Sequence, residues 1–334
     1  MLDARGVVLS RMNGAALITG GAGCIGSDLA ETLVRQGENV VLFDNLSSGR
    51  MEHIEPLLSC SNCRFIKADL LDFEAVQSAM RGLHSVYHLA ANPDIRFTPG
   101  DATDKDLRQN IIATYHVLEG MRREQVGRII FASTSAVYGL SNGRPMPEDY
   151  PTRPISLYAA TKLGCEGLIC AFQHLFGFKA WIFRFANIVG RKSRKKGRTV
   201  ISDFIAKLEA DPRRLEILGN GKQAKSYLLS QECVDGMLFA VAHAQAGLNI
   251  FNLGCNDQVT VDEIARRVVA RMGLHDVEFV YSGGEAGWLG DVPRFLLDVT
   301  AINKLGWRAK INSAEAVETA IGEILEDREV PSGG

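Results

Sequence analysis

Tyr158 and Lys162 stand four residues apart and could together abstract a proton. The residues around them favour a helix, which would place both side chains on one face. A lysine ammonium beside a phenol stabilises the phenolate and lowers a pKa that is normally about 10. We therefore interpret Tyr158 as a candidate general base. The same spacing occurs in many helices without a catalytic role, so the pair needs support from its surroundings.

A cluster of hydroxyl side chains supplies that support. Ser133, Thr134 and Ser135 directly follow an apolar stretch at 129–132 that is typical of a buried strand. Open α/β sheets bind their ligands at the carboxyl ends of their strands, and a hydroxyl there would hold a substrate oxygen on the path of the proton to Tyr158. Serine-rich strand ends also occur as simple turns.

Three glycines near the amino end form the pattern of a phosphate-binding loop. Gly20, Gly23 and Gly26 lie at three-residue intervals between an apolar strand at 15–19 and a helical stretch at 24–35. Glycines let the backbone turn tightly and approach a pyrophosphate, whose charge is stabilised at the amino end of the helix. The loop predicts a dinucleotide site, although such turns also form for packing reasons.

An acidic residue at the end of the second strand narrows the choice of dinucleotide. Asp44 lies 18 residues after Gly26, close to where a carboxylate binds both ribose hydroxyls. This carboxylate would repel a 2′-phosphate, which favours NAD over NADP, while Arg50 leaves NADP open. Asp69, after the third strand, could reach the adenine edge or could equally cap the next helix beside Asp72.

Strands and helices alternate through the first half of the chain, and this alternation predicts how the candidate residues are positioned. The predicted strands lie at 15–19, 40–43, 64–68, 85–89, 128–132 and 181–185, and the predicted helices at 24–35, 73–80 and 107–123. Continuous apolar strands with helical crossovers are typical of a parallel sheet covered on both faces. The sequence therefore predicts a doubly wound α/β fold of the Rossmann type.

After about residue 180 the pattern loosens, with one more strand at 181–185, and it predicts a smaller, mixed α/β lobe. Helical periodicity returns at 200–208, 231–244, 261–272 and 314–325. We expect an N-terminal tail at 1–14, a dinucleotide-binding domain at 15–188, a mainly substrate-binding lobe at 189–329 and a disordered tail at 330–334. No linker rich in Pro or Ser separates the halves, so the chain is free to cross between lobes that pack around a cleft.

Composition argues against several classes of protein. The 334 residues carry a net charge of −2, which gives no field to attract nucleic acid, and no apolar run approaches the roughly 18 residues that span a membrane. Seven scattered cysteines and an apolar run at 7–9 too short for a secretory signal favour a cytoplasmic protein. Cys60 and Cys63 lack the second half of a zinc site, so we expect no metal, and His88 is typical of a packing histidine.

In combination, these motifs resemble the extended short-chain dehydrogenase/reductase family. The matching motifs are the glycine loop, Asp44-Asn-Leu-Ser-Ser-Gly49, His88-Leu-Ala-Ala91, the run at 133–139, Tyr158-x-x-x-Lys162 and Arg184-Phe-Ala-Asn-Ile-Val-Gly190. The chain is most similar to nucleotide-sugar epimerases of the UDP-glucose 4-epimerase type, in particular archaeal-like members, from residue 15 to about 328.

The resemblance implies a role for each matching residue. The catalytic residues would be Thr134 as hydroxyl partner, Tyr158 as base, and Lys162, which would bind the nicotinamide ribose and tune Tyr158. The cofactor NAD would be bound by Gly20, Gly23, Cys24, Ile25, Gly26, Asp44, Asn45, Ser47, Gly49, Asp69, Leu70, Leu89, Ala90, Ala91, Asn110, Ser133, Tyr158 and Lys162. The nucleotide-sugar substrate would be bound by Thr134, Ser135, Tyr158, Asn187, Arg191, Lys225, Asp291 and Phe295.

The resemblance also implies a reaction that begins with oxidation of the sugar at C4. Relatives that dehydrate or decarboxylate carry an acid directly after the threonine, where this chain has Ser135 and Ala136. Elimination then lacks its general acid/base, and NAD-dependent epimerisation at C4 is the expected reaction. Phe295 resembles a bulky residue that narrows the sugar pocket, which favours UDP-glucose and UDP-galactose.

Other functions stay open at this point. One is 4-epimerisation of UDP-glucuronate or a UDP-N-acetylhexosamine, another is a net nucleotide-sugar dehydrogenase or reductase, and a third is an NAD-binding sensor or scaffold without turnover. Lys225 and Trp288 stand where the family often has arginines, so bidentate diphosphate binding is lost there. The basic loop at 191–198 would either take over that role or form a solvated surface.

Two helical stretches predict the oligomeric state. The apolar faces of 107–123 and 157–176 would form a four-helix contact with a second subunit, or would simply cover the sheet. The resemblance favours the first interpretation, a homodimer.

Overall fold

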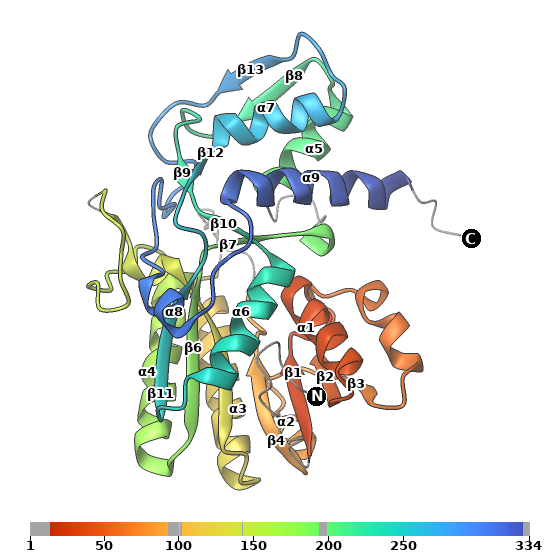
Figure 1. The fold of residues 1–334 in the computed structure, drawn as a ribbon, viewed down its shortest axis with the longest axis vertical. Helices are drawn as coiled ribbons and strands as arrows, with labels where there is room; N and C mark the ends of the chain where they lie inside the picture. Colours follow the sequence, from red (N-terminus) through yellow and green to blue (C-terminus); the bar gives the residue numbers. More distant parts are fainter. Residues whose placement is uncertain (1–13, 93–99, 101, 142, 194–198, 330–334) are drawn as a thin grey trace.

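A seven-stranded parallel sheet forms the centre of the molecule (Figure 1), which a computed structural model describes for residues 14–92, 100, 102–141, 143–193 and 199–329. Its order is β11-β6-β5-β4-β1-β2-β3. The strands are β1 (Ala15–Thr19), β2 (Asn39–Asp44), β3 (Cys63–Lys67), β4 (Leu83–His88), β5 (Arg128–Thr134), β6 (Lys179–Phe185) and β11 (Leu248–Leu253). The order reverses at β1, so a ligand crevice is expected at the carboxyl ends of β1 and β4. The predicted doubly wound fold is confirmed.

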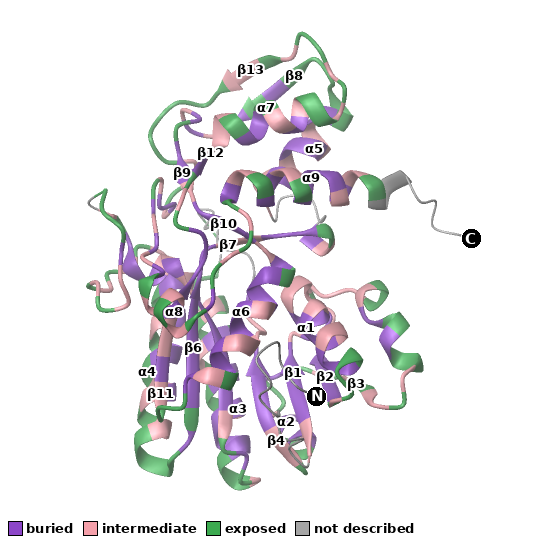
Figure 2. Ribbon diagram, in the orientation of Figure 1, coloured by how far each residue is buried: buried purple, intermediate pink, exposed green. Residues whose placement is uncertain are grey.

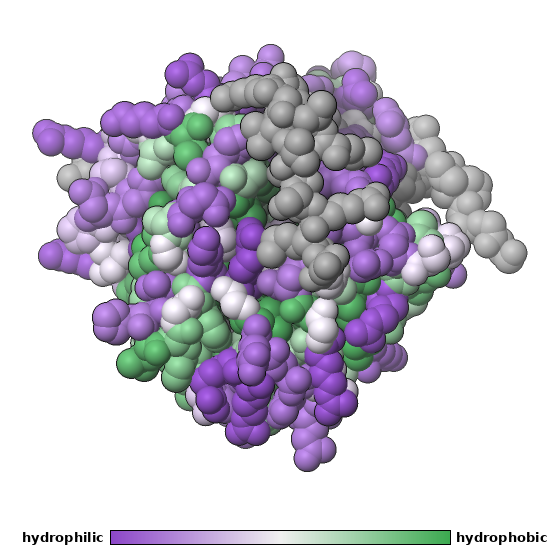
Figure 3. Space-filling view, turned by 60° about the horizontal axis from the view of Figure 1, so that its bottom comes forward, coloured by the Kyte–Doolittle hydropathy of each residue, from purple (hydrophilic) through white to green (hydrophobic). Residues whose placement is uncertain are grey.

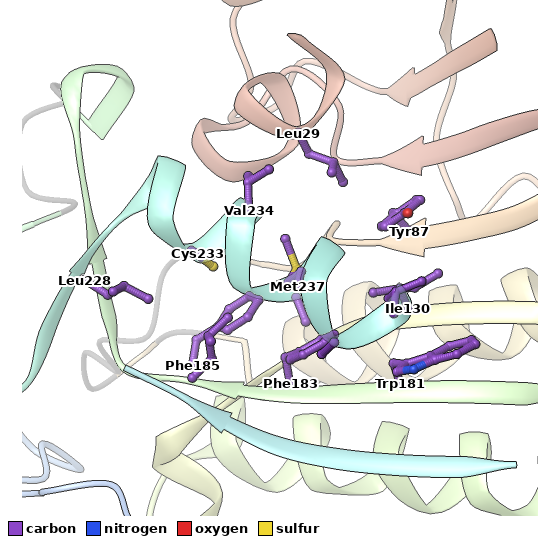
Figure 4. Close-up of a cluster of buried hydrophobic side chains, with 14 of the residues drawn as sticks. Leu29, Tyr87, Ile130, Trp181, Phe183, Phe185, Leu228, Cys233, Val234 and Met237 are labelled. Carbon is purple, nitrogen blue, oxygen red and sulfur yellow. The ribbon is translucent and has the colours of Figure 1, made fainter. Parts of the chain in front are cut away.

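Helices cover both faces of this sheet because its strands are apolar on both sides, and Figure 2 shows the central strands largely buried. One face carries α1 (Cys24–Arg35) and α6 (Ser230–His243), and the other carries α2 (Phe73–Ala79), α3 (Ala113–Arg123) and α4 (Leu157–Phe176). Alternate residues of β6 enter different cores, since Trp181 and Phe183 belong to the first and Ile182 to the second. Figure 4 shows Met237 of α6 between Leu29 of α1 and Phe183 of β6.

A third core holds the smaller lobe together, over one end of the sheet (Figure 1). Its helices are α5 (Val200–Ala210), α7 (Val261–Arg271) and α9 (Ser313–Glu329), and α8 (Thr300–Leu305) packs on β11. Its strand pairs are β7 (Asn187–Val189) with β10 (Tyr227–Leu229), β9 (Ala224–Lys225) with β12 (Val259–Thr260), and β8 (Arg214–Ile217) with β13 (Glu278–Tyr281). Within the described ranges, no helix is both long and apolar enough to cross a membrane.

The chain crosses back from the smaller lobe to the sheet. Helix α6 packs on α1, and β11 pairs with β6 in parallel, although both lie in the part of the sequence assigned mainly to the second lobe. The helix predicted at 107–123 also differs in detail, because Leu107–Ile112 form a π-helical turn ahead of α3. Residues 1–13 of the tail expected at 1–14, and the tail expected at 330–334, lie outside the described residues.

Candidate active site

The glycine loop approaches its neighbours so closely that two of its positions exclude any side chain. A Cβ on Gly26 would lie 2.2 Å from the carbonyl oxygen of Gly20. Gly20 itself has φ +69°, and a Cβ there would lie 2.8 Å from the backbone nitrogen of Ala90. Gly23 precedes the first residue of α1 as its cap. The loop thus leaves unpaired N–H groups at the amino end of α1 for a phosphate.

Asp44 ends β2 next to this loop, and its carboxylate ties the two together. One oxygen accepts a hydrogen bond from the N–H of Ala22 at 3.0 Å, and the other accepts from the N–H of Leu46 at 2.8 Å. Each carboxylate oxygen has a second lone pair, so Asp44 can still accept hydrogen bonds from a ribose. Asn45 donates to Asp69 at 2.8 Å, which joins the turns after β2 and β3.

These turns enclose a hollow that gathers many of the predicted cofactor residues. It is lined by Gly20, Phe43, Asp44, Asn45, Ser47, Ser48, Ala68, Asp69, Leu70, Leu71, Ala90, Ala91, Gln109 and Ala113. Eight of these were predicted from the sequence, and the hollow lies at the carboxyl ends of β1 and β2. Its wall offers two carboxylates, two amides and apolar surface, which are suitable for an adenosine. Gly49 packs beside it, and a Cβ there would lie 2.8 Å from the Cβ of Ala22 and 2.9 Å from the carboxylate of Asp44.

Cys24, also predicted to contact the cofactor, is turned to another neighbour. Its sulfur lies 3.2 Å from Oγ of Ser193, and burial raises the pKa of the thiol to about 11. The ammonium of Lys192 pairs with Asp28 of α1 at 2.7 Å, and the backbone N–H of Arg191 donates to Glu323. The start of the basic loop therefore binds α1 through Lys192 and Ser193, and α9 through Arg191. The rest of this loop, 194–198, lies outside the described residues.

Thr134 and Tyr158 meet at the carboxyl end of β5. Oγ1 of Thr134 accepts a hydrogen bond from the N–H of Ala136 at 3.2 Å, and the same hydroxyl lies near enough to the phenol of Tyr158 to act against the rise of its pKa on burial. The side chain of Ser156 accepts a hydrogen bond from the N–H of Ala159 and so caps the amino end of α4, which places Tyr158 in the first turn of this helix. The hydroxyl pair predicted from the sequence is therefore assembled, whereas Ser135 is buried in the following 3-10 turn, Ser135–Tyr138.

Lys162 extends from the next turn of α4 into the interior. Its ammonium donates to the carbonyl of Ala132 at 2.7 Å and lies 4.6 Å from the centre of the Phe131 ring. Burial lowers the pKa of Lys162 to about 8. Burial also raises the pKa of Tyr158 to about 12, against the hydrogen bond from Thr134. The expected lowering of the phenol pKa by Lys162 is therefore not produced by the chain alone.

Asn110 joins the π-helical turn to the catalytic helix. Its side-chain oxygen accepts from the N–H of Asn92 at 3.1 Å, and its nitrogen donates to Oγ1 of Thr161 at 2.9 Å. Thr161 lies between Tyr158 and Lys162 on α4. Asn110 thus lies near the site as predicted, and it also holds α4 against the segment that follows β4.

A buried polar network behind this site was missed by the sequence analysis. Arg184 of β6 pairs with Glu166 of α4 at 2.7 and 3.1 Å, and Ser133 donates to the same carboxylate. Arg184 also donates to the hydroxyl of Tyr138 at 3.0 Å, and this hydroxyl donates to Asn252 of β11 at 2.7 Å. A glutamate four residues after Lys162 was the available signal, since both lie on one face of α4.

The substrate side holds two of its predicted charged residues in a pair. Lys225 contacts Asp291 at 2.6 Å, and its ammonium lies 5.0 Å from the centre of the Trp288 ring. The two departures from the family pattern, Lys225 and Trp288, therefore contact each other. Asn187 of β7 pairs with Tyr227 of β10, and Phe295 is buried in the first core.

The interpretation of His88 as a packing residue is confirmed. Its two ring nitrogens lie 2.7 Å from Thr19 and 3.0 Å from Thr114, and burial lowers its pKa to about 3. Cys60 and Cys63 are free thiols at a turn before β3. In the part of the chain that the structure describes, no three His, Cys, Asp or Glu side chains gather as a metal site would require.

Comparison with known proteins agrees with this geometry. The model of the NAD dependent epimerase/dehydratase family matches residues 16–254. The chain belongs to this family. As a member of the epimerase/dehydratase family it uses NAD, which the glycine loop and Asp44 fit.

Relatives of this epimerase/dehydratase are named for, or have been solved with, several UDP-sugars. A UDP-glucose 4-epimerase of Mycolicibacterium smegmatis is 28% identical over 91% of this chain and 96% of its own. A solved UDP-galactose 4-epimerase is 37% identical, with a TM-score of 0.83 over 95% of this chain and 99% of its own. MoeE5 in complex with UDP-glucuronic acid and NAD is 28% identical, with a TM-score of 0.82 over 94% and 99%.

Proposed function

We propose that this protein interconverts UDP-glucose and UDP-galactose by epimerisation at C4, through a transient 4-keto sugar. The observation that carries the proposal is the juxtaposition of Thr134 and Tyr158 at the carboxyl end of β5, where the hydroxyl of Thr134 acts to lower the pKa of the phenol, with Lys162 one turn later on α4. The likeness to a UDP-galactose 4-epimerase at 37% identity supports this choice of sugar.

Some residues of the chain would bind the cofactor and the sugar, and Tyr158 would transfer the proton. The glycine loop would hold the pyrophosphate and Asp44 the adenosine ribose. When bound, NAD would supply the hydride acceptor and donor for the carbon at C4, and its oxidised form would add positive charge to the site. Thr134 would hold the C4 oxygen, and Tyr158 would take its proton when cationic charge beside the phenol offsets the cost of burial.

The residues after Thr134 support epimerisation over elimination. Ser135 is buried and Ala136 has no polar side chain, so neither can protonate a leaving hydroxyl at that position. The ketone would then be returned to an alcohol on either face. Because no oxidised or reduced product leaves, the cofactor would stay bound between turnovers.

A second candidate substrate, UDP-glucuronate, is favoured by the cation at Lys225. Its ammonium is held by Asp291 and could re-pair with an anionic ligand. MoeE5, which has been solved with both UDP-glucuronic acid and UDP-glucose, is a relative for which both sugars are ligands.

The test uses purified protein without added cofactor and follows the anomeric protons of each sugar nucleotide by NMR. UDP-glucose should convert to a mixture with UDP-galactose, and Tyr158→Phe should abolish conversion while leaving bound NAD unchanged. If UDP-glucuronate alone is converted, the substrate of this epimerase is UDP-glucuronate rather than UDP-glucose. If no sugar converts while NAD is retained, the protein is not an epimerase of these sugars.

We also propose that the protein is a homodimer formed through α3 and α4. Large apolar side chains are exposed on these helices and the turn before them, namely Leu107, Ile112, Tyr115, Leu157, Leu175 and Phe176. Figure 3 looks toward the end of the molecule where α3 and α4 end in Figure 1, and hydrophobic surface lies there between hydrophilic side chains. Burying this surface in a four-helix contact would remove it from water.

A further inference from the structure

Glu166 is a buried carboxylate with no role in the proposed proton transfer. Its exposed fraction is 4%, and it is held from two strands at once. Arg184 of β6 binds both of its oxygens, and Ser133 of β5 donates its hydroxyl to one of them. A bidentate pair with an added hydroxyl fixes the carboxylate in one position.

The fixed position of the Glu166 carboxylate matters because the ammonium of Lys162 is buried on the same helix. The two residues lie one turn apart on α4, and Lys162 is 2% exposed. The ammonium has a carbonyl and an aromatic ring as contacts, and neither carries a full negative charge. A buried ammonium without an anion loses its proton readily.

Three titratable groups act on Lys162 from the elements packed around it. Cys165 and Glu166 lie on α4, and His88 lies on β4. Burial raises the pKa of the Cys165 thiol and lowers that of His88 to about 3, so both are neutral near pH 7. Among these three, Glu166 is left as the group that can carry a full negative charge.

We propose that Glu166 is a positioning residue whose carboxylate, held by Arg184 and Ser133, supplies the counter-charge that keeps the Lys162 ammonium protonated on the face of α4 that carries Tyr158. The inference rests on the proposed function, in which Lys162 tunes the base. It adds that the charge of Lys162 is maintained by a residue that touches neither substrate nor cofactor.

The first test replaces the charge and keeps the shape, in Glu166→Gln. The opposing charge raises the pKa of Lys162, so its loss should lower that pKa. With a wild-type pKa of about 8, the protonated fraction should fall most near pH 8 and change least well below that pH. The rate constant kcat should fall with the same pH dependence. Glu119→Gln, which removes a carboxylate from α3 instead, is the matched control and should leave the pH profile unchanged.

A second variant separates charge from folding. Glu166→Gln alone leaves Arg184 without its anion and could fail to fold, so it is paired with Glu166→Gln/Arg184→Met, which removes both charges. Bound NAD and thermal unfolding report whether each variant is folded. A folded double variant that keeps the wild-type pH profile would mean that Glu166 acts through packing alone, and the proposal would be wrong.

A titration independent of turnover keeps this test separate from the proposed function. Lysine labelled with ¹³C at Cε is followed by NMR, and the Lys162 signal is assigned by its loss in Lys162→Met. The Lys162 midpoint should move to lower pH in the Gln variants, whichever sugar is the substrate. An unchanged midpoint would overturn the inference even if epimerisation is confirmed, and a shifted midpoint would uphold it even if UDP-glucose proves not to be the substrate.

Discussion

Substituting Gly26 by alanine should remove the cofactor while leaving the fold intact. The added Cβ would lie 2.2 Å from the carbonyl oxygen of Gly20, and real Cβ atoms essentially never come closer than 3.0 Å, so the loop and α1 must separate by at least 0.8 Å. Such a shift misaligns the N–H groups at the start of α1. Losing two charge-assisted hydrogen bonds of about 1.5 kcal/mol each costs about 3 kcal/mol, or a weakening of NAD binding of roughly 150-fold.

The assay is the NAD content of the purified protein, with the dissociation constant measured by calorimetry on stripped protein. Gly127→Ala is the matched control, because a Cβ at Gly127 meets nothing within 4 Å. That variant should bind NAD as the wild type does. If Gly26→Ala retains a full complement of NAD at wild-type affinity, the N–H groups at the start of α1 do not bind the pyrophosphate.

Three other outcomes follow from the structure. The pKa of Lys162 falls from 10.5 to about 8 on folding, so the unfolded chain binds more protons between these pH values and the stability of the wild type rises with pH there. Lys162→Met should therefore be up to about 3 kcal/mol more stable than the wild type at pH 7. Urea unfolding at pH 7 and pH 10 should show this difference in stability shrinking at the higher pH. Trp288→Arg should lower KM for UDP-glucose with little change in kcat, because a guanidinium beside Lys225 can bind a diphosphate in a bidentate manner; steady-state kinetics with an unchanged KM would place the diphosphate elsewhere. Leu175→Asp should convert a dimer to monomers in sedimentation, whereas a dimer that survives it is not formed through this end of α4.

Local patterns explain why much of the fold could be predicted. The glycine loop, the apolar strands and Asp44 each depend on residues close together in sequence, and their order along the chain determines which elements can be neighbours in the sheet. The sequence therefore predicted six strands of the central sheet to within a few residues. Tyr158 and Lys162 were predictable for the same reason, since a helix brings residues four apart to one face.

Contacts between distant segments could not be predicted in this way. The pair of Lys225 and Asp291 joins residues 66 positions apart, and it turns two predicted substrate contacts toward each other. Strand β11 lies between two predicted helices, where a short strand was expected, but its place in the central sheet was not predicted because it returns to the sheet only after the chain has built part of the second lobe. The raised pKa of Tyr158 was missed as well, because the cost of burying a phenol depends on the whole surrounding core rather than on the lysine one turn away.

The return of β11 to the sheet has a consequence for how the protein is made. Sixty-two residues separate Phe185, the last of β6, from Leu248, the first of β11. At the usual 5–20 residues per second, a ribosome needs about 3 to 12 s to synthesise them. During that interval β6 is an open edge whose N–H and C=O groups can pair with another nascent chain. We expect the sheet to be completed, and the surface of α1 to be covered by α6, only after residue 253 has left the ribosome. The dinucleotide-binding domain, most of which is synthesised first, therefore finishes folding only when these later residues are made.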